Sequence, residues 1–452
     1  MGFCTFTKMQ INTMKPLNRF SPAISLLIVV LLFQTGHNLR CQINPTINAS
    51  RLENTLLTLA TFGRDEHGAP NRVAFSDGDI LGREYVMSLM QDAGLQVKID
   101  AAANIIGFRD GSEPGLKPIA FGSHIDMVPH GGNYDGCAGS LSAIEIIQVL
   151  KEKNITTRHP LEVILFSNEE GGVMGSRAIA GELKPEALTV RNSTGYTMGE
   201  GIERLGGDTT RLDEVIREPG SLTAFLELHI EQGGILDREG LDIGVVEGIV
   251  GLSWWDVTFT GRANHAGTTP MNLRQDALLA AARFIQAVNE EAIALKGSQV
   301  ATVGRISAAP GAPNVIPGEV KLSLEIRDIS EVVIEEMYQK IEARGQQIAR
   351  NSGLSVSFQK LDTTGKPALT DVRIQGIIEQ EAQTLNFTSN RMQSGAGHDA
   401  QDMAVIVPTG MIFVPSEGGI SHAPDEFTRP EELGKGAQVL LNTLLRIDRE
   451  WD

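Results

Sequence analysis

The chain has 452 residues, of which 41% are hydrophobic and 21% are charged, and this balance is typical of a soluble globular protein with two or three domains. It excludes a disordered protein, a polytopic membrane protein and a fibrous repeat. The formal net charge of −17 argues against a nucleic-acid partner, because a phosphate backbone is bound by clustered lysine and arginine side chains. The 3 cysteines form no C-x-x-C pair and are too few for a disulfide scaffold.

The first 41 residues are predicted to be a signal peptide or an N-terminal anchor. Basic residues precede a short apolar run over residues 23–33, and a polar stretch follows it, which is the order of a secretory signal. The run is shorter than the roughly 20 apolar residues that span a bilayer. We therefore expect the protein to be exported, either periplasmic or secreted. The alternatives are a membrane-anchored protein and, if translation starts at Met9 or Met14, a cytoplasmic one.

From residue 46 onward, the sequence predicts an α/β domain with a mostly parallel sheet. Leucine, valine and methionine recur at helical spacing in two segments, and short apolar runs then alternate with amphipathic segments. The predicted elements are, in chain order, helices at 51–62 and 80–94, a strand at 118–123, a helix at 139–153 and strands at 161–167, 222–230 and 410–415. The strand, helix and strand between residues 118 and 167 form a β-α-β unit, which indicates a parallel sheet.

Residues 247–363 are predicted to form a second domain that is inserted into the first. Its elements are a strand at 253–261, a helix at 275–294, strands at 300–306 and 319–328, a helix at 331–351 and a strand at 354–361. This β-α-β-β-α-β order is the ferredoxin-like arrangement. The α/β domain therefore consists of two parts, residues 46–246 and residues 364–452.

Histidines and carboxylates follow the ends of several predicted strands. They are His124, Asp126 and Asp135 after the first strand, Glu169 and Glu170 after the second, His229 after the third and His422 after the last. Ligands of open α/β sheets bind at the carboxyl ends of the strands, so these side chains are expected to converge. A single histidine at a strand end is more often structural, and a Glu-Glu pair is often a solvated helix start. The joint pattern instead favours a site for Zn²⁺, Mn²⁺ or a similar ion, because it combines imidazole and carboxylate ligands without a thiolate.

Five segments resemble the hydantoinase/carbamoylase family of binuclear metallo-amidases, which belongs to the aminoacylase and carboxypeptidase-like metallohydrolases. These segments are GSHIDMVPHGGNYDG, SNEEGG, LELHIEQG, TGRANHAGTTPM and the pair SGAGHDAQDM and GGISHAPDE. The resemblance extends in order from about residue 46 to the C-terminus. The family includes allantoate amidohydrolases, N-carbamoyl-L-amino-acid hydrolases and β-ureidopropionase-like enzymes. The resemblance to it implies that the inserted domain serves as a lid and in dimerisation.

The resemblance implies two divalent metal ions per subunit, either Zn or Mn. His124 and His229 are implied to bind one ion, Glu170 and His422 are implied to bind the other, and Asp135 is implied to bridge the two. Such a bridge suits the short metal–metal distance of two-metal hydrolases. The acid Asp126 is implied to hydrogen-bond the imidazole of His124 and to fix its tautomer. The peptide bond after the bridging acid is often cis in this group, so Asp135–Gly136 is predicted to be cis.

Catalytic and substrate-binding roles are also implied by the resemblance. Glu169 is implied to be the general base, which takes a proton from a metal-bound water and returns it to the leaving nitrogen. His265 is implied to reach the active site of the other subunit and to stabilise the oxyanion. The implied substrate contacts are the amide of Gln232, the side chains of Asn314 and Arg327, and a backbone N–H of Gly397. A turn residue at Asn314, a surface ion pair at Arg327 and a plain turn glycine at Gly397 are the simpler alternatives, and His398 is expected to be structural.

The predicted function is the metal-dependent hydrolysis of a linear amide or ureido C–N bond other than a peptide bond. The expected substrate is a small carboxylate-bearing molecule, either an N-carbamoyl-L-amino acid or allantoate, and the expected assembly is a homodimer. The first alternative is a dipeptidase or an N-acyl-amino-acid deacylase, although such enzymes tend to carry an acid at the position of His229. The second is a non-catalytic binding protein, which would be expected to have lost Glu169 or a ligand. The exact substrate, the metal and the subunit that supplies Asn314 and Arg327 stay open.

Overall fold

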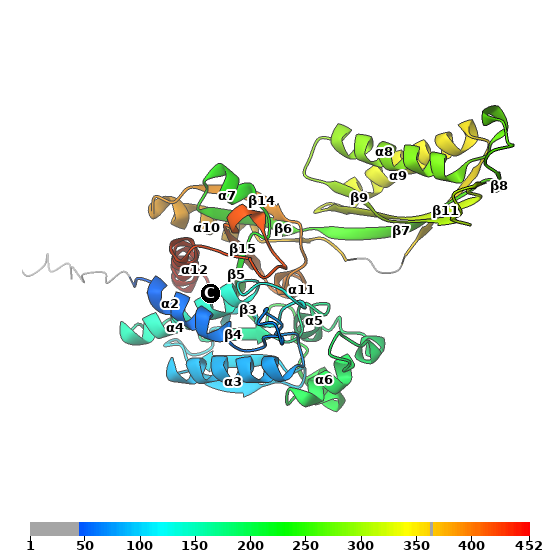
Figure 1. Cartoon of the computed structure of the whole chain (residues 1–452). Helices are drawn as coiled ribbons and strands as arrows, with labels where there is room; N and C mark the ends of the chain where they lie inside the picture. Colours follow the sequence, from blue (N-terminus) through cyan, green and yellow to red (C-terminus); the bar gives the residue numbers. More distant parts are fainter. Residues whose placement is uncertain (1–44, 362–364) are drawn as a thin grey trace, which may run out of the picture. The chain divides into compact units, whose positions relative to one another are not determined.

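The computed structural model of the protein describes residues 45–361 and 365–452 (Figure 1). The predicted signal peptide or anchor over residues 1–41 lies outside these residues, so it stays a prediction. Within the two described ranges, no helix has both the length and the apolar character that crossing a membrane requires.

A mixed sheet with nine strands among the described residues forms the centre of the α/β part. Its order is β1 (Gln96–Ile99), β2 (Ile105–Arg109), β4 (Leu161–Phe166), β3 (Ile119–His124), β5 (Ala224–Ile230), β15 (Thr409–Val414), β6 (Ile243–Ile249) and β13 (Ala368–Leu369), and β14 (Ser389–Ser394) also pairs with β6. The central strands β4, β3, β5 and β15 run parallel to one another, whereas β1, β2 and β13 pair antiparallel at the edges. Because helices cover both faces, the central strands are apolar along most of their length.

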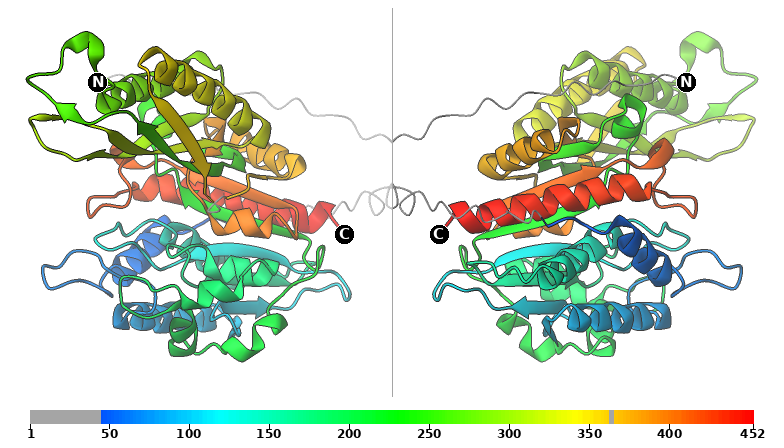
Figure 2. Two further views of the ribbon diagram at one scale, coloured as in Figure 1. Left: turned by 90° about the vertical axis from the view of Figure 1, so that its right-hand side faces the viewer. Right: turned by 90° about the vertical axis from the view of Figure 1, so that its left-hand side faces the viewer.

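The two faces of the sheet belong to two hydrophobic cores. Along β4, Leu161, Val163 and Leu165 point into one core, and Ile164 and Phe166 point into the other. The first core is completed by α2 (Ala49–Leu59), α3 (Asp77–Asp92), α4 (Cys137–Glu152), α10 (Val372–Thr384) and α12 (Pro430–Glu450). The second is completed by α5 (Met174–Ala180), α7 (Ile235–Glu239) and α11 (Asp399–Met403). Figure 2 shows α12, in red, running along the sheet, where it contacts β5 and β15.

A second sheet is formed by residues 251–360. Its elements are β7 (Gly251–Thr260), α8 (Ala277–Ala294), β9 (Val300–Ala309), β11 (Glu319–Asp328), α9 (Glu331–Asn351) and β12 (Ser355–Lys360). The strand order is β12-β7-β11-β9 with every pair antiparallel, and α8 and α9 cover one face (Figure 1). This is the ferredoxin-like arrangement, so the predicted fold class is confirmed. The predicted domain boundaries at 247 and 363 stay a prediction.

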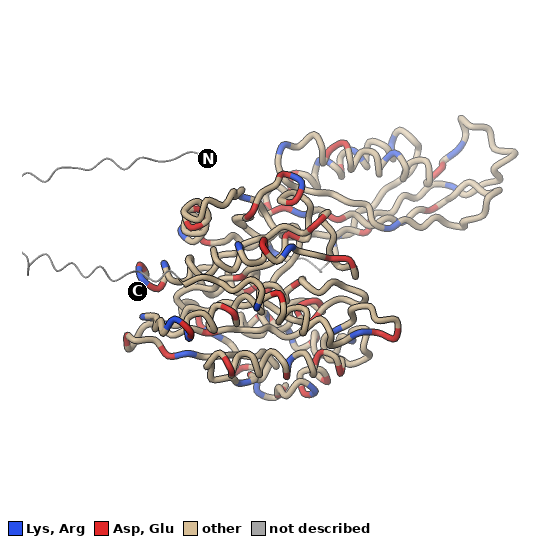
Figure 3. The backbone as a smooth tube through the Cα atoms, turned by 60° about the vertical axis from the view of Figure 1, so that its left-hand side comes forward, with Lys and Arg blue, Asp and Glu red and all other residues tan. Residues whose placement is uncertain are grey.

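Smaller elements connect the two sheets and their helices. They are β8 (Asn264–His265), β10 (Val315–Ile316), α6 (Met198–Arg204) and 3₁₀ turns at Pro185–Thr189, Thr209–Glu214, Met271–Leu273 and Glu417–Gly419. Charged residues of both signs are interspersed along the described chain (Figure 3). Some of them join neighbouring helices, such as Arg51 of α2 with Glu145 of α4 at 2.7 Å and Arg344 of α9 with Glu291 of α8 at 2.8 Å.

Candidate metal centre and active site

The predicted ligands lie at the carboxyl ends of three neighbouring strands. His124 is the last residue of β3, His229 is the last but one of β5, and Glu170 lies in the loop that follows β4, next to the predicted general base Glu169. The strands are parallel and adjacent in the order β4-β3-β5, so their carboxyl ends meet at one edge of the sheet. The topology therefore brings these residues together, as expected for a ligand site in an open α/β sheet.

The carboxylate of Asp135 lies between three imidazoles. Its Oδ1 is 3.1 Å from Nε2 of His229 and 3.6 Å from Nε2 of His124, and its Oδ2 is 3.2 Å from Nε2 of His422. Burial opposes a charge on this carboxyl group, but the three imidazoles hold its pKa well below the ordinary range. The two oxygens thus face different ligand groups, which is the geometry that a bridging ligand needs.

Two groups of potential ligands share this carboxylate. In each group the ligand atoms lie within 4.8 Å of one another, and the groups are His124, Asp135 and His229 on one side and Asp135, Glu170 and His422 on the other. In the second group, Oε2 of Glu170 is 3.5 Å from Nε2 of His422. This is the division that the family resemblance implies, and the assignment of the five residues as metal ligands remains a prediction.

The orientation of the buried imidazoles fits a divalent cation. Nδ1 of His124 is 3.1 Å from the carbonyl oxygen of Asp126, and Nδ1 of His229 is 2.9 Å from the carbonyl oxygen of Ile230. Because a carbonyl only accepts hydrogen bonds, Nδ1 of each ring carries a proton, and Nε2, on the side of Asp135, is the ring nitrogen that could bind a cation. Oε1 of Glu170 is also buried and has no hydrogen-bond partner among the described residues. A histidine that binds a metal ion usually donates its other ring N–H to a carbonyl or carboxylate oxygen, as the rings of His124 and His229 do.

Asp126 supports the site in a different way from the one predicted. Its carboxylate is 3.6 Å from Nδ1 of His124, so the closer contact to this ring is made by its own backbone carbonyl. The carboxylate oxygens accept hydrogen bonds from the backbone N–H groups of Glu169 and Glu170, each at 3.2 Å. Asp126 therefore orients a predicted ligand and also holds the Glu169–Glu170 segment against it.

Glu169 and Glu170 face different sides of the centre. Oε2 of Glu169 is 3.6 Å from Nε2 of His124, in the first ligand group, whereas Glu170 faces the second group. Burial raises the pKa of Glu169 well above its ordinary value; neighbouring carboxylates, Asp399 foremost, act in the same direction, and His124 opposes them. Glu169 is thus a buried carboxyl group beside the ligands but outside both groups, which is a suitable position for a general base.

Gln232 contacts the bridging carboxylate directly. Its Nε2 donates to Oδ2 of Asp135 at 2.6 Å and lies 3.4 Å from Nε2 of His422. Gln232 and His422 also have positive φ angles, 57° and 53°, and Asn168, directly before Glu169, has one of 51°. Such conformations are unfavourable for residues other than glycine and concentrate at functional sites. The predicted substrate-contacting amide therefore lies at the centre itself.

The prediction of a cis peptide bond between Asp135 and Gly136 is wrong. Among the described residues, the cis bond is Ala309–Pro310. Gly136 instead adopts φ 61° and ψ −43°, and its N–H points to Nε2 of His229 at 3.2 Å. A Cβ at this position would lie 2.4 Å from ring atoms of His124. The chain therefore turns into α4 through a left-handed glycine that also allows close approach of the imidazole.

His265 and Asn314 lie together on the short β8–β10 ladder. His265 pairs with Val315, and the N–H of Ala266 donates to the carbonyl oxygen of Asn314 at 3.0 Å. The His265 ring is exposed, and its Nδ1 accepts hydrogen bonds from the N–H groups of Gly267 and Thr268 at 3.0 and 3.2 Å, so Nε2 carries the proton. In the described part of this single chain, neither residue has a hydrogen bond or ion pair with a predicted metal ligand.

Arg327 lies beside the turn that contains Gly397. Its guanidinium forms two hydrogen bonds with Glu325, at 2.9 and 3.1 Å, and Nη1 donates to the carbonyl oxygen of Gly395 at 2.8 Å. In this chain by itself, Arg327 thus forms an ion pair with Glu325, and its predicted contact with a substrate stays a prediction. Gly397 is exposed, and a Cβ there would meet only the Gln401 side chain, at 3.5 Å. No neighbour among the described residues thus requires glycine at this position.

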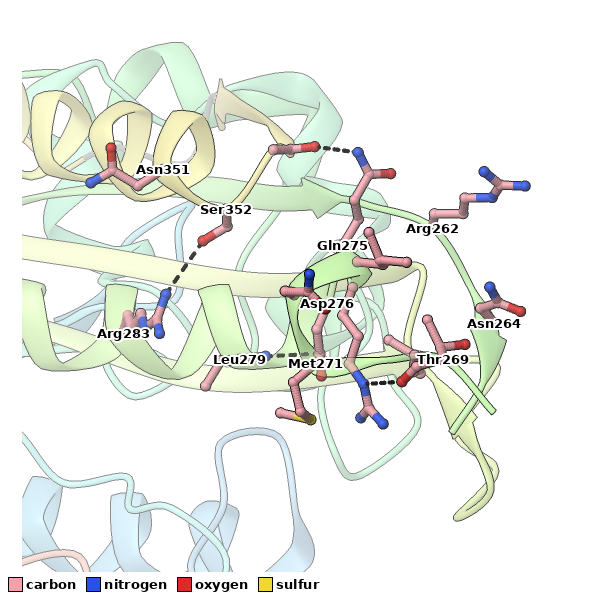
Figure 4. A pocket seen from close by; sticks show the side chains of 15 residues that line it. Arg262, Asn264, Thr269, Met271, Gln275, Asp276, Leu279, Arg283, Asn351 and Ser352 are labelled. Atoms are coloured by element: carbon pink, nitrogen blue, oxygen red, sulfur yellow. Dashed lines mark hydrogen bonds between the residues drawn. The ribbon is translucent and has the colours of Figure 1, made fainter. Parts of the chain in front are cut away.

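A pocket of about 640 Å³ is lined by residues that flank His265 in the chain, such as Asn264 and Thr269 (Figure 4). Three arginines contribute to its lining, Arg262, Arg274 and Arg283. None of the five predicted metal ligands lines it. The predicted metal ligands therefore lie at the strand ends and in the loops of the sheet, and not in this pocket.

Several buried carboxylates beside the centre were not predicted, among them Glu227, Glu426 and Asp399. Glu227 on β5 accepts from Oγ of Ser123 at 2.6 Å and from the N–H of Ala400 at 2.9 Å. A charged residue on a fully buried strand, two positions before His229 and so on the same face, is a signal that could have revealed it. Glu426 follows His422 by four residues, and no local pattern distinguishes it from a surface acid.

His398 is buried against the centre, although a structural role was predicted for it. Its Nε2 is 2.8 Å from Oγ of Ser394, and its ring centroid is 4.4 Å from that of His229. The ligand atoms of Glu227, His229 and His398 also lie within 4.8 Å of one another. Burial lowers the pKa of His398 well below its ordinary value, so the ring is neutral.

Comparisons with known proteins identify the family. The sequence model of peptidase family M20/M25/M40 matches residues 120–446. An N-carbamoyl-L-amino acid amidohydrolase from Geobacillus stearothermophilus is 38% identical over 406 residues, which cover 89% of this chain and 99% of that protein. A ureidoglycolate hydrolase from Arabidopsis thaliana is 39% identical and covers 89% of this chain and 87% of that protein.

A solved structure agrees with these relatives. It is an amidase of the hydantoinase/carbamoylase family from Burkholderia multivorans, with a TM-score of 0.83 and 35% sequence identity, and the match covers 89% of this chain and 98% of that chain. The resemblance inferred from the five motifs is therefore confirmed, and so is the predicted class of enzyme, a hydrolase of linear C–N bonds other than peptide bonds. On the family model and these nearly full-length matches, the chain belongs to peptidase family M20/M25/M40 and is similar to its hydantoinase/carbamoylase-type amidases.

Proposed function

We propose that the protein hydrolyses a ureido or amide C–N bond in a small substrate that carries a carboxylate, with the help of two divalent ions. The observation that carries this proposal is the Asp135 carboxylate, whose two oxygens face two separate ligand groups with Glu169 beside them. The relatives suggest the substrate class, since their names specify N-carbamoyl-L-amino acids and ureidoglycolate. Allantoate is chemically similar and is a further candidate.

In the proposed reaction, each residue around the carbonyl group of the substrate has a separate task. When bound, Zn²⁺ or Mn²⁺ would supply positive charge and lower the pKa of a water molecule. Glu169 takes the proton of the attacking water and passes it to the leaving nitrogen. Asp126 keeps Glu169 in place through the 3.2 Å hydrogen bond from the Glu169 N–H. Burial of Glu169 excludes bulk water, so the proton is transferred within the site.

The substrate carboxylate needs a local positive group, because the net charge of −17 repels anions at long range. We assign this task to Arg327, with Asn314, Gln232 and the backbone of Gly397 as further contacts. A guanidinium binds a carboxylate with two parallel hydrogen bonds, and Arg327 already forms this arrangement with Glu325. The substrate carboxylate would therefore compete with Glu325 for the same guanidinium.

A homodimer through the second sheet is supported by two exposed apolar features. β9 is the outermost strand of that sheet and exposes Val300 (51%) and Ile306 (49%). The neighbouring helix α8 exposes Leu278, Ile285 and Ile293, which recur at helical spacing. An unpaired strand edge and an apolar helix stripe of this kind invite pairing with an identical copy. In such a dimer, we propose that His265 acts at the partner's centre.

Subunit mixing tests the dimer and the action of His265 in trans. Glu169→Gln and His265→Ala are each expected to be nearly inactive as homodimers. When the two variants are unfolded and refolded together, activity should recover to about a quarter of the wild-type value, because half of the dimers are mixed and each of these has one complete site. The control is each variant refolded alone. If mixing restores no activity while both proteins are dimeric, His265 does not act across the interface.

The substrate proposal is tested by a parallel assay with added Zn²⁺ or Mn²⁺. Ammonia or amine release would be measured with N-carbamoyl-L-amino acids, allantoate, ureidoglycolate, 3-ureidopropionate and a dipeptide panel. We expect turnover of one or more ureido substrates and at least about 10²-fold lower kcat/KM for dipeptides, since a site that orients a ureido group leaves its polar groups unpaired with a peptide. Turnover of dipeptides alone would overturn the proposal in favour of a peptidase.

A further inference from the structure

One buried carboxylate, that of Glu426, joins the loop of the bridging residue to the loop of His422. Its Oε1 accepts hydrogen bonds from the backbone N–H groups of Tyr134 and Asp135, at 2.9 and 3.0 Å. Its Oε2 accepts from Oγ of Ser421 at 2.8 Å and from the N–H of His422 at 3.2 Å. Glu426 is 3% exposed, and its four partners occupy the roughly four acceptor sites that a carboxylate offers.

The loop before Asp135 is packed closely around this side chain. A Cβ at Gly132 would lie 1.9 Å from Oε1 of Glu426, so only glycine lets the loop pass. Next to these contacts, the ring of Tyr134 packs edge-on against that of Phe427, with centroids 5.5 Å apart. Both loops are therefore fixed to the same carboxylate by hydrogen bonds and to each other by packing.

The two loops have no local connection that would fix their spacing. Asp135 and Glu426 are 291 positions apart in the sequence. His422 has a φ of 53°, a strained conformation that persists where the surroundings enforce it. The hydrogen bond from the His422 N–H to Glu426 is part of that enforcement. Gln232 and Ser421 also contact Oδ2 of Asp135, but Glu426 is the residue that holds the backbone of both loops. The distance of 3.2 Å between Oδ2 of Asp135 and Nε2 of His422 thus depends in part on Glu426.

We propose that Glu426 is a positioning residue that sets the separation of Asp135 and His422, and thereby the affinity of the ion held by Asp135, Glu170 and His422. This inference rests on the proposed two-metal function. His124 and His229 are positioned by their own strands and by the carbonyls of Asp126 and Ile230, so the other ion depends less on Glu426.

The test is a metal titration of the full metal-free protein with Co²⁺, followed by visible absorbance, and with Zn²⁺, followed by calorimetry. Glu426→Gln keeps the size of the side chain but has a single acceptor oxygen, so one pair of donors faces an NH₂ group. We expect the wild type to bind two ions. In Glu426→Gln, the ion held by Asp135, Glu170 and His422 should bind about 10–100-fold more weakly, the usual effect of losing a partner that supports a ligand, and the other ion, which shares only Asp135 with it, should be affected less.

Two further variants make the result specific. Glu417→Gln changes an exposed acid that precedes the same loop and should bind both ions like the wild type. Glu426→Asp keeps the carboxylate charge but shortens the side chain by one methylene, so it cannot keep all four contacts, and the ion held by Asp135, Glu170 and His422 should again bind more weakly; this variant decides the matter if Glu426→Gln does not fold. Wild-type affinity at both sites, or an equal loss at both, would overturn the positioning role. If the wild type itself binds no ions, the proposed metal centre fails and this inference fails with it.

Discussion

Replacement of Glu169 by glutamine is expected to lower kcat by about 10²–10⁴-fold, the usual contribution of a general acid–base group, while two ions stay bound. Glutamine has nearly the same size but cannot take up a proton. Glu169 belongs to neither ligand group, and its nearest ligand contact is Nε2 of His124 at 3.6 Å. The measurement is kcat on the best ureido substrate together with the metal content of the purified variant.

The neighbouring residue provides a matched control. Glu170→Gln makes the same chemical change one position along the chain, but it alters a predicted ligand. We expect this variant to lose metal as well as activity, whereas Glu169→Gln loses activity alone. Retained turnover in Glu169→Gln would remove Glu169 as the base, and a loss of metal from that variant would show that it is a ligand instead.

The positions of His124 and His229 could be predicted because the strands that carry them are unambiguous in the sequence. IAFGSH and AFLELHI are short, mostly apolar runs, and both are buried along their full length. Neighbouring parallel strands bring the residues at their carboxyl ends to one edge of the sheet. Glu170 and His422 lie in loops, so their roles depended on the family resemblance and not on any periodic pattern.

Several elements of the fold could not be predicted, since tertiary pairing rather than local preference forms them. β14 has the sequence SNRMQS, which is polar except for Met392 and is typical of a loop. It becomes a strand because it pairs in parallel with β6, whose apolar side chains are buried. β1 and β2 are only four and five residues long, too short for alternation to be distinguished from chance.

The supporting contacts of the centre were also beyond sequence reasoning. Asp126 was expected to hold His124 through its carboxylate, but that carboxylate binds the backbone of Glu169 and Glu170. Glu426 could not be predicted, because its four hydrogen-bond donors come from two loops that meet only in the folded chain. Residue type and spacing identify ligands, whereas backbone N–H directions, which decide these contacts, exist only after folding.

Asp135→Asn is expected to abolish the binding of both ions and to lower activity by at least about 10³-fold, because the ions supply several kcal/mol of transition-state stabilisation. Asp135 is the one residue that both ligand groups share, and its oxygens face His124, His229 and His422. In asparagine one of these oxygens becomes an NH₂ group, which cannot coordinate a cation. The negative charge that faces the three imidazoles is lost as well.

The readouts are metal content and the effect of a chelator on thermal stability. Ions that bind only the native state raise the Tm of the wild type, so a chelator should lower it. The Tm of Asp135→Asn should not respond to the chelator. The matched control is Asp65→Asn, since Asp65 also contacts a histidine, His130 at 3.2 Å, but lies outside both ligand groups and should keep both ions. If Asp135→Asn still binds two ions per chain, Asp135 is not the bridge and the two groups do not form a single centre.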